Sequence, residues 1–447
     1  MTLAVDSLRA DLSAMLDSTS VASDAAVLAA LAVDDKVPAT AVAPTTAEQV
    51  APVLQYASEH HQGLIARGNG TKLSMGAPPR QYDIALSLRE MKRVTHYEPA
   101  DLTISVEAGM TFGEFQTLVG QNGLWLPLDP RGGPDATMGG IIAANAAGPL
   151  RQAFGGPRDM VLGLKIATTD GKIAKTGGRV VKNVAGYDLG KLLTGSFGTL
   201  GVIVEASLKL FPKPPERATF VMRAGTLGIA RELRRGILRS PLDPMRLVLL
   251  DSGAVALLES SAPSDVQAGA ELWVEVGGSH RVIERCMLEL KHAAFAVGAT
   301  LARREGAEEA WGKVSNLALW LQTKYRDVTV LKAALPLAAS EEFLSYAEQE
   351  AEAERVRLAG FAQVGVGVVH LCLLQETMGA NVTGLVLRLR RSANGLKGSL
   401  VVEHCPLDLK NQLDVWGSDG DDLPIMRKMK SAWDPEGVLA PGRFLGF

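Results

Sequence analysis

The sequence predicts an α+β protein of two domains, and three observations lead to this class. Residues 37–214 read as short apolar strands and helices separated by glycine-rich loops, which is typical of α/β units. A proline cluster at 212–215 then interrupts the pattern and predicts a domain boundary. Beyond this boundary, strands alternate with long helical stretches such as 225–240 and 279–298, an order that favours an antiparallel sheet.

These boundaries predict four segments in the 447-residue chain. They are a helical arm over 1–36, a first domain over 37–214, a second domain over 215–424 and a C-terminal tail over 425–447.

Composition excludes several classes of protein. The chain is 47% hydrophobic and 21% charged, with a formal net charge of −3, which does not indicate binding to nucleic acid or to an anionic membrane. The three cysteines, Cys286, Cys372 and Cys405, are far apart, so neither a disulfide framework nor an iron–sulfur cluster is expected. We see no signal peptide and no apolar run of 18 residues, which predicts a cytoplasmic protein with no direct membrane span.

Secondary structure can be assigned most clearly in the first half. An amphipathic helical arm rich in Ala and Leu is predicted over 3–31, and a further helix starts at Thr45 or Thr46 and ends near His60, before Gly63. The segment 82–110 predicts half-buried strands. A helix over 111–123 follows, and then a hairpin whose turn is Asp170-Gly171.

The first chemical motif is RGNGTKLSMG, residues 67–76, which directly follows a short strand. Backbone N–H groups in such a loop can converge on an anion, and Arg67 and Lys72 add positive charge. A plain surface turn is the alternative. The loop is neither a Walker A motif nor a GxGxxG fingerprint.

Two further glycine-rich blocks follow, at 127–151 and 179–212. The first block has almost no side-chain bulk between Thr137 and Gly148, so a flat cofactor ring could lie close to its backbone; tight helix packing is the alternative. In the second, Gly195, Gly198 and Gly201 precede an apolar strand. One such loop is weak evidence of a cofactor, but three in this order are strong.

Together these motifs resemble the FAD-binding domain of the vanillyl-alcohol oxidase superfamily, the PCMH-type FAD-linked oxidases and dehydrogenases. The resemblance covers residues 38–214 and resumes at Asp434-Pro435 and Pro441-Gly442-Arg443, which are similar to the family's DPxGxLNPG tail. It implies a FAD domain of two α/β subdomains, to which the tail returns, and a C-terminal antiparallel-sheet cap domain. The smaller FAD-binding subunits of bacterial glycolate oxidases are the most similar group.

The resemblance also implies where FAD binds. The 67–72 loop would hold the pyrophosphate, the second block the ribityl chain and isoalloxazine, and the third the adenine side. The implied cofactor-binding residues are Arg67, Gly68, Asn69, Gly70, Thr71, Lys72, Pro127, Leu128, Asp129, Thr137, Gly139, Gly140, Ala143, Asn145, Gly198, Thr199, Gly201, Val202 and Arg443.

Two positions depart from the family pattern. Asn69 replaces a glycine, and we expect it to take a left-handed backbone conformation. Ala440 replaces an asparagine, so one hydrogen bond near the flavin is expected to be missing. No His or Cys stands where relatives attach flavin covalently, so non-covalent FAD is predicted.

Catalytic residues are expected in the second domain. In 2-hydroxy-acid enzymes of the family, one motif resembles HxGDGNxH and another GEHGxGxxK, and together they supply metal ligands and a histidine base. Residues 362–371, AQVGVGVVHL, keep His370 of the first motif but have Gln363 at its first histidine. Residues 402–410, VEHCPLDLK, keep Glu403 and His404 of the second. Gln is a poor substitute for imidazole on a transition metal, so no metal is predicted.

Three interpretations of His370, Glu403 and His404 stay open at this point. They retain a weakened catalytic role, they are a structural vestige, or they are ordinary core and surface residues. A Glu and a His that satisfy each other in a core would look the same in sequence.

The predicted function is that of a FAD-binding subunit of a glycolate (2-hydroxy acid) oxidase or dehydrogenase complex. Its implied partners are a larger FAD-containing subunit and an iron–sulfur subunit, through which it would at most be peripheral to the inner membrane. The alternatives are a self-sufficient FAD-dependent D-2-hydroxy-acid dehydrogenase of the D-lactate type and a flavin-holding scaffold without catalysis of its own.

Overall fold

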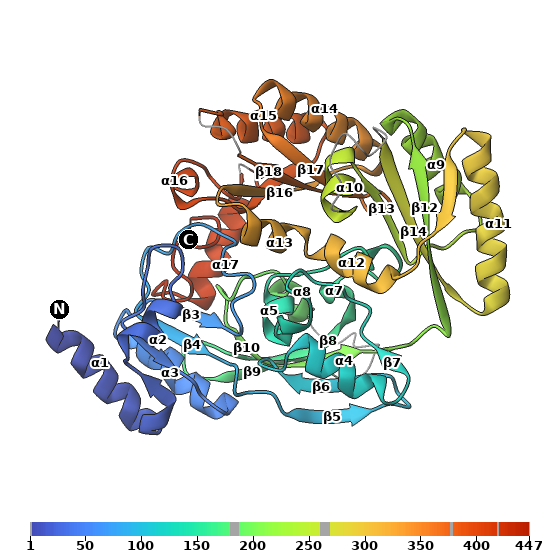
Figure 1. The fold of residues 1–447 in the computed structure, drawn as a ribbon. Helices are drawn as coiled ribbons and strands as arrows, with labels where there is room; N and C mark the ends of the chain where they lie inside the picture. Colours follow the sequence, from blue (N-terminus) through green and yellow to red (C-terminus); the bar gives the residue numbers. More distant parts are fainter. Residues whose placement is uncertain (1, 179–186, 260–268, 376–378, 418–419, 447) are drawn as a thin grey trace. The chain divides into compact units, whose positions relative to one another are not determined.

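The part of the chain that the structure describes contains three β-sheets and one two-stranded ribbon (Figure 1). The computed structural model describes residues 2–178, 187–259, 269–375, 379–417 and 420–446. Two compact units divide the chain. Unit 1 comprises Met1–Ala147, Gly156–Pro212 and Ser418–Phe447, and unit 2 comprises Gly148–Gly155 and Lys213–Gly417. The chain passes from unit 1 to unit 2 between Pro212 and Lys213.

A small sheet of unit 1 is built on two parallel strand pairs. Its order is β1 (Val21–Ala22), β2 (Thr40–Val42), β4 (Ile84–Ser87) and β3 (Leu64–Arg67). β4 pairs in parallel with β2 and β3, and β1 is antiparallel to β2. Between β2 and β3 the chain forms α3 (Ala47–Glu59), whose start and end agree with the predicted helix. β3 therefore delivers the 67–76 loop directly from its last residue.

The second sheet of unit 1 is antiparallel throughout. Its order is β5 (Val94–Glu98), β6 (Thr103–Glu107), β10 (Val202–Lys209), β8 (Val161–Ala167) and β9 (Ile173–Gly177). The predicted hairpin is the β8–β9 pair, with Gly171 at φ +76° in its turn. A ribbon of β7 (Leu124–Trp125) and β11 (Phe211–Pro212) completes the strands of this unit.

Helices of unit 1 pack on these sheets. The predicted helix after residue 111 is α4 (Phe112–Gly120), which begins with a capping box of Thr111 and Glu114. The others are α1 (Thr2–Met15), α2 (Ala25–Ala30), α5 (Met138–Ala143), α7 (Pro157–Met160), α8 (Leu189–Leu193) and α17 (Leu423–Trp433).

Two sequence-based expectations for unit 1 are wrong. Residues 3–31 do not form one helix, because Asp17 caps a short 3-10 turn and Val21–Ala22 pair with β2 as an edge strand. β4 and β6 are buried along nearly their whole length rather than half-buried. Arg179, Asn183 and Gly186 of the third glycine block lie outside the described residues.

An eight-stranded antiparallel sheet forms unit 2, as the sequence predicts. Its order is β15 (Thr300–Arg303), β12 (Glu216–Ala224), β14 (Ala270–Gly278), β13 (Arg246–Leu250), β17 (Arg357–Gln363), β18 (Val368–Leu374), β16 (Val328–Ala334) and β19 (Ser399–His404). Each of its neighbouring pairs is antiparallel.

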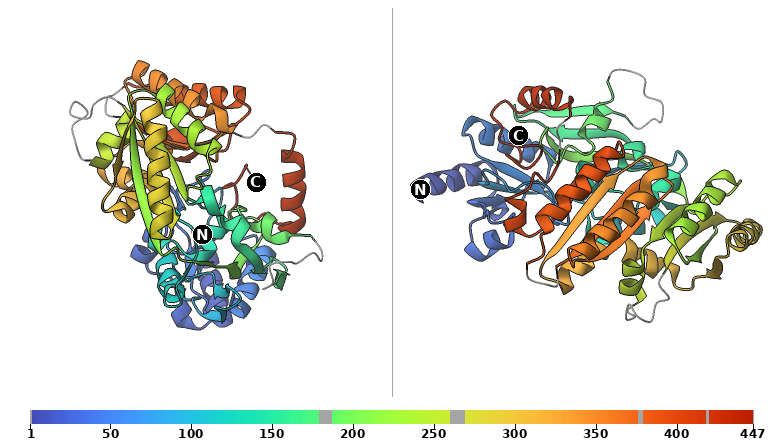
Figure 2. Two further views of the ribbon diagram at one scale, coloured as in Figure 1. Left: turned by 90° about the vertical axis from the view of Figure 1, so that its right-hand side faces the viewer. Right: turned by 90° about the horizontal axis from the view of Figure 1, so that it is seen from above.

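Helices cover both faces of this sheet. One layer contains α9 (Leu227–Arg239), α11 (His280–Ala296), α14 (Ser340–Ala353) and α15 (Val382–Gly395). Figure 2, left, shows the yellow α11 lying along the yellow-green strands β12 and β14. The opposite face packs α10 (Ser252–Glu259), α12 (Ala307–Ser315) and α13 (Leu317–Lys324) around an edge-to-face pair of Trp273 and Trp311. Two short helices, α6 (Arg151–Phe154) and α16 (Leu407–Lys410), complete unit 2.

Candidate functional site

A small cavity of about 90 Å³ lies in unit 1, where β3 ends and α5 begins. Segments far apart in sequence form its wall: the 65–75 stretch, the start of α5, the loop before β10 and the C-terminal tail. The lining residues are Ile65, Ala66, Arg67, Gly68, Gly70, Thr71, Lys72, Leu73, Met75, Thr137, Gly140, Ala143, Ala144, Phe197, Ala440 and Arg443.

Close backbone approach explains the glycines of the first loop. A Cβ on Gly68 would lie 2.1 Å from Oγ1 of Thr137, so only glycine lets the loop reach the start of α5. Gly70 adopts the left-handed conformation, with φ +77°. The expectation that Asn69 would do so is wrong: its side chain instead donates a hydrogen bond to the Asp135 carbonyl at 2.8 Å, which ties two loops together.

Three cationic side chains line this cavity. Arg67 donates to the Leu31 carbonyl at 3.0 Å, and Lys72 donates to the Arg131 carbonyl at 2.7 Å. Arg443 is buried, and burial lowers its pKa, although Asp34 at 3.6 Å opposes this effect. A cavity lined by a glycine-containing loop and three fixed cations suits an anionic ligand such as a pyrophosphate.

Arg443 also holds the first loop in shape. Its guanidinium donates to the carbonyls of Leu73 at 2.7 Å, Ala77 at 3.2 Å and Met75. The tail itself is anchored by Lys430, whose buried ammonium donates to Asp434 at 2.5 Å and to the Thr199 carbonyl at 2.9 Å. The tail is therefore a wall of the cavity.

Other residues predicted to bind cofactor do not line the cavity itself, and their role in cofactor binding stays a prediction. They are Asn69, Pro127, Leu128, Asp129, Gly139, Asn145, Gly198, Thr199, Gly201 and Val202. Some have evident structural tasks. A Cβ on Gly139 would lie 2.7 Å from that of Ala108, and Thr199 bonds to the Ser196 carbonyl at 2.7 Å.

The predicted cofactor-binding residues did not include seven other residues that line the cavity, which are Ile65, Ala66, Leu73, Met75, Ala144, Phe197 and Ala440. Phe197 and Ala440 have positive φ angles of +54° and +47°, which side-chain-bearing residues rarely adopt. Nothing in the residue types indicates this conformation. The only available signal was their position inside the glycine-rich loop and the family-like tail.

In unit 2, one face of the sheet gathers the predicted catalytic residues. His370 on β18 lies opposite Lys332 on β16, and Lys332 lies opposite Val401 on β19. Directly opposite residues share a face, and so do residues two apart on one strand. Glu403 therefore lies on the face of His370, and the distance from its Oε2 to Nδ1 of His370 is 3.9 Å.

A β-bulge brings His404 to the same face. Leu331 pairs with Val402 and Val330 with His404, so Glu403 is the extra residue of β19. Val330 shares the face of Lys332, and His404 opposite it does so too. The ring of Phe361 stacks on His370 at 4.7 Å between centroids, which fixes the imidazole plane.

The glycines of AQVGVGVVHL have packing tasks. Gly367 turns the chain at φ +74°, and its N–H donates to the Gln363 carbonyl. A Cβ on Gly365 would lie 1.8 Å from Oε1 of Gln152, so the helix α6 packs directly on this turn. Gln363 itself is 2% exposed at the end of β17.

The residues present do not fit a divalent metal. Within the described ranges, no group of three or more His, Cys, Asp and Glu side chains could hold a metal ion. His370 and Glu403 are two candidate ligands, but the third position is Gln363. Lys332, which sequence reasoning missed, instead places an ammonium group on this face. Only strand pairing reveals its proximity to His370, because the two residues are far apart in sequence.

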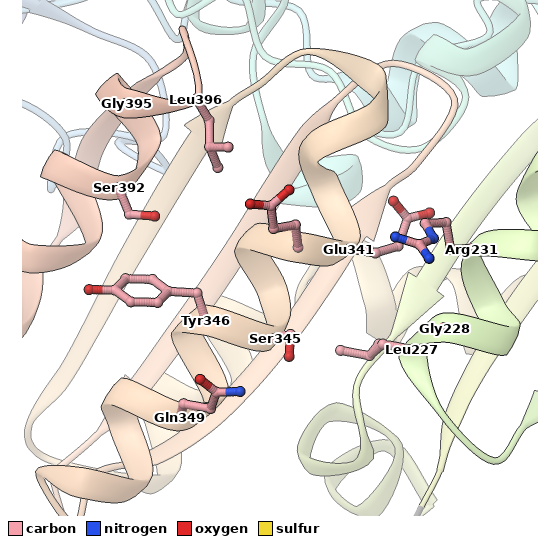
Figure 3. A pocket seen from close by; sticks show the side chains of 11 residues that line it. Leu227, Gly228, Arg231, Glu341, Ser345, Tyr346, Gln349, Ser392, Gly395 and Leu396 are labelled. Carbon is pink, nitrogen blue, oxygen red and sulfur yellow. The ribbon is translucent and has the colours of Figure 1, made fainter.

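A second cavity lies in unit 2, between α9, α14 and α15 (Figure 3). Ser345, Tyr346 and Gln349 of α14 line it together with Arg231 of α9 and Ser392 of α15. Glu341 also lines it but is buried and ion-paired with Arg234 at 2.5 Å. None of the residues predicted from the sequence lies here.

The chain belongs to the FAD-linked oxidases. The family described as FAD linked oxidases, C-terminal domain, matches residues 213–444, and the FAD binding domain matches residues 38–177. FAD is therefore the cofactor, and the small-residue, cation-lined cavity in unit 1 fits its pyrophosphate. Among the described residues, no helix is long and apolar enough to cross a membrane.

Individual relatives are similar over most of their length. Glycolate oxidase subunit GlcD of Bacillus subtilis is 27% identical over 91% of this chain and 88% of its own. A D-lactate dehydrogenase of Archaeoglobus fulgidus is 28% identical over 90% of each chain. The mitochondrial D-lactate dehydrogenase (cytochrome) of Arabidopsis thaliana is 26% identical over 92% of this chain and 74% of its own.

Solved structures show the same fold at low identity. An alkyldihydroxyacetonephosphate synthase is 16% identical with a TM-score of 0.77, covering 97% of this chain and 84% of its own. p-Cresol methylhydroxylase is 16% identical with a TM-score of 0.75, covering 98% and 96%. The predicted fold, an FAD-binding domain with an antiparallel C-terminal domain, is thereby confirmed.

Proposed function

We propose that this protein is the FAD-binding subunit of a glycolate (2-hydroxy acid) oxidase or dehydrogenase complex. Its substrate would be a small 2-hydroxy acid, and its electrons would pass through non-covalent FAD to an iron–sulfur partner beside a larger FAD-containing subunit. The names of the relatives, a glycolate oxidase subunit and D-lactate dehydrogenases, support this substrate class.

One observation carries the proposal: a cation, two imidazoles and a carboxylate share one sheet face on three neighbouring strands. Lys332 offers an ammonium group that can pair with a substrate carboxylate. In this proposal His404 would accept the hydroxyl proton, and Glu403, which lies 3.9 Å from His370, would balance the charge of this cluster. When bound, FAD supplies the acceptor for a hydride from the α-carbon.

Gln363, which stands where the family motif has a histidine, supports a division of labour between subunits. In enzymes that use a metal ion, the metal polarises the substrate oxygen as a Lewis acid and stabilises the transition state by several kcal/mol. A site without a metal lacks this contribution. A subunit that works beside another flavin subunit does not need to perform the whole reaction alone. The same reasoning makes isolated activity with D-lactate the less favoured alternative.

The test is anaerobic reduction of the bound flavin, followed by its absorbance. The purified chain is mixed with glycolate or D-lactate, first alone and then within the complex that copurifies with it. We expect slow or no bleaching alone and fast bleaching in the complex, with loss of the fast phase in Lys332→Met. Fast bleaching alone would favour the self-sufficient dehydrogenase, and a flavin that no complex reduces would leave only the scaffold.

A further inference from the structure

Phe197 has an unusual backbone for an aromatic residue. Its φ is +54°, although it has no glycine-like freedom, and its half-buried ring lines the FAD cavity. Left-handed backbone is found at only a few per cent of non-glycine residues and is an outlier for bulky side chains. Such strain persists where the surroundings determine it, and it concentrates at ligand sites.

Hydrogen bonds hold Phe197 in this conformation. Its N–H donates to the Ala143 carbonyl at 2.9 Å, and the N–H of Gly195 donates to the Ile142 carbonyl at 3.0 Å. Ala143 is itself a lining residue of the cavity, so the loop is fixed to the end of α5. The strained backbone therefore fixes the ring at the cavity wall.

A second ring supports the first from the tail. Phe444 stacks on Phe197 with 5.5 Å between ring centroids and 23° between ring planes. The preceding residue, Arg443, is fixed by the carbonyls of the 73–77 loop. The two rings thus join the loop before β10 to the tail.

We propose that Phe197 is a cofactor-binding residue whose ring packs against a planar ring system of FAD, and that Phe444 is its positioning residue. The shared ligand chemistry is a flat heteroaromatic ring, supplied by either the isoalloxazine or the adenine. This inference concerns FAD alone and is independent of the proposed substrate and complex.

The first test separates the ring from the backbone. Fluorescence titration of the full-length apoprotein with FAD measures Kd for Phe197→Ala, Phe197→Gly and Phe197→Tyr. We expect Kd to rise about tenfold in the Ala and Gly variants and to stay near wild type in Tyr. The Gly variant should also melt at a higher temperature than the Ala variant without FAD, because glycine tolerates positive φ.

Leu102 offers a matched control. It is half-buried in the same unit at φ +55° but does not line the cavity. Leu102→Gly should leave the Kd for FAD unchanged. An unchanged Kd in Phe197→Ala, or an equal loss in Leu102→Gly, would overturn the proposal.

Ligand fragments identify the ring. FMN and ADP are titrated into wild type and Phe197→Ala. If Phe197→Ala weakens the binding of FMN alone, the ring contacts the isoalloxazine, and if it weakens the binding of ADP alone, the ring contacts the adenine. Unchanged affinity for both ligands contradicts a ring contact. Phe444→Ala should shift the visible circular dichroism of bound FAD, and Phe444→Tyr should restore it. An unchanged spectrum in Phe444→Ala would remove its positioning role.

Discussion

Ala440 shows how one residue can carry strain in the wall of a cavity. It lines the unit 1 cavity at φ +47°, and its N–H donates to the Leu64 carbonyl at 2.8 Å. Left-handed backbone costs an alanine roughly 1–2 kcal/mol, whereas asparagine tolerates it. The tail motif of the family has an asparagine at this position, where a hydrogen bond near the flavin is expected. The positive φ is a second reason why asparagine suits this position better than alanine.

Ala440→Asn should therefore stabilise the protein. We expect the free energy of unfolding to rise by about 0.5–1 kcal/mol, because asparagine adopts positive φ at lower cost. Urea denaturation of the apoprotein measures this change. Ala143→Asn, on the same cavity wall but in a helix, is the control and should not stabilise. A loss of stability in Ala440→Asn would show that the observed φ carries no strain.

The side chain of Lys332 can also be tested by substitution, and this test rests on the proposed function. Lys332→Met should lower kcat/KM for flavin reduction by the hydroxy acid about 100-fold, because a charged hydrogen bond to the carboxylate is lost. Lys332→Arg should retain more activity than Lys332→Met. The control is Lys324→Met, an exposed change at the end of α13. Equal kinetics in Lys332→Met and the control would exclude a role in substrate binding.

At the scale of elements, helix ends and tight turns could be predicted from the sequence because they are determined by residues close together in the chain. The helix α4, the Asp170-Gly171 turn and the glycine after α3 all depend on neighbouring residues. The break in the arm over 3–31 could not be predicted from neighbouring residues, because β1 forms only by pairing with β2. Strand pairing across long sequence separations likewise concealed Lys332 beside His370.

The helix α17 offers a test of how the tail is held. Lys430 is buried among Asp434 and two backbone carbonyls, and burial lowers its pKa. Lys430→Met leaves the Asp434 carboxylate buried without its cation, which should cost about 3–5 kcal/mol of stability. Chemical denaturation measures this loss, and FAD affinity should fall with it.

An exposed lysine on the same helix is the control. Lys428→Met should change neither stability nor FAD binding measurably. If Lys430→Met behaved in the same way, the ion pair would not anchor the tail.

At the scale of the whole molecule, a buried acid makes stability depend on pH. Asp251 accepts N–H groups of Ala254 and Gly360 inside unit 2, and burial raises its pKa to about 8. Between its ordinary pKa of 3.8 and about 8, the folded state holds a proton that the unfolded state has lost. The contribution of this group to stability therefore falls as pH rises through that window.

Asp251→Asn removes this dependence. Melting temperatures from pH 5 to 8.5 should fall more steeply in wild type than in the variant, because asparagine does not ionise. The absolute stability of the variant is not the readout, since it also changes the hydrogen bonds to Ala254 and Gly360. Parallel pH profiles would show that Asp251 does not titrate in this range.

The order in which the chain enters its two units has a consequence for biosynthesis. Residues 148–155 belong to unit 2 although both flanking segments belong to unit 1, and residues 418–447 return to unit 1 after unit 2 is complete. Ala440 and Arg443 line the unit 1 cavity. A nascent chain on the ribosome therefore lacks a complete cavity until residues 440–443 have left the exit tunnel. If this cavity holds FAD, as proposed, the cofactor can be retained only after that point, and ribosome-stalled chains ending before residue 440 should not retain FAD.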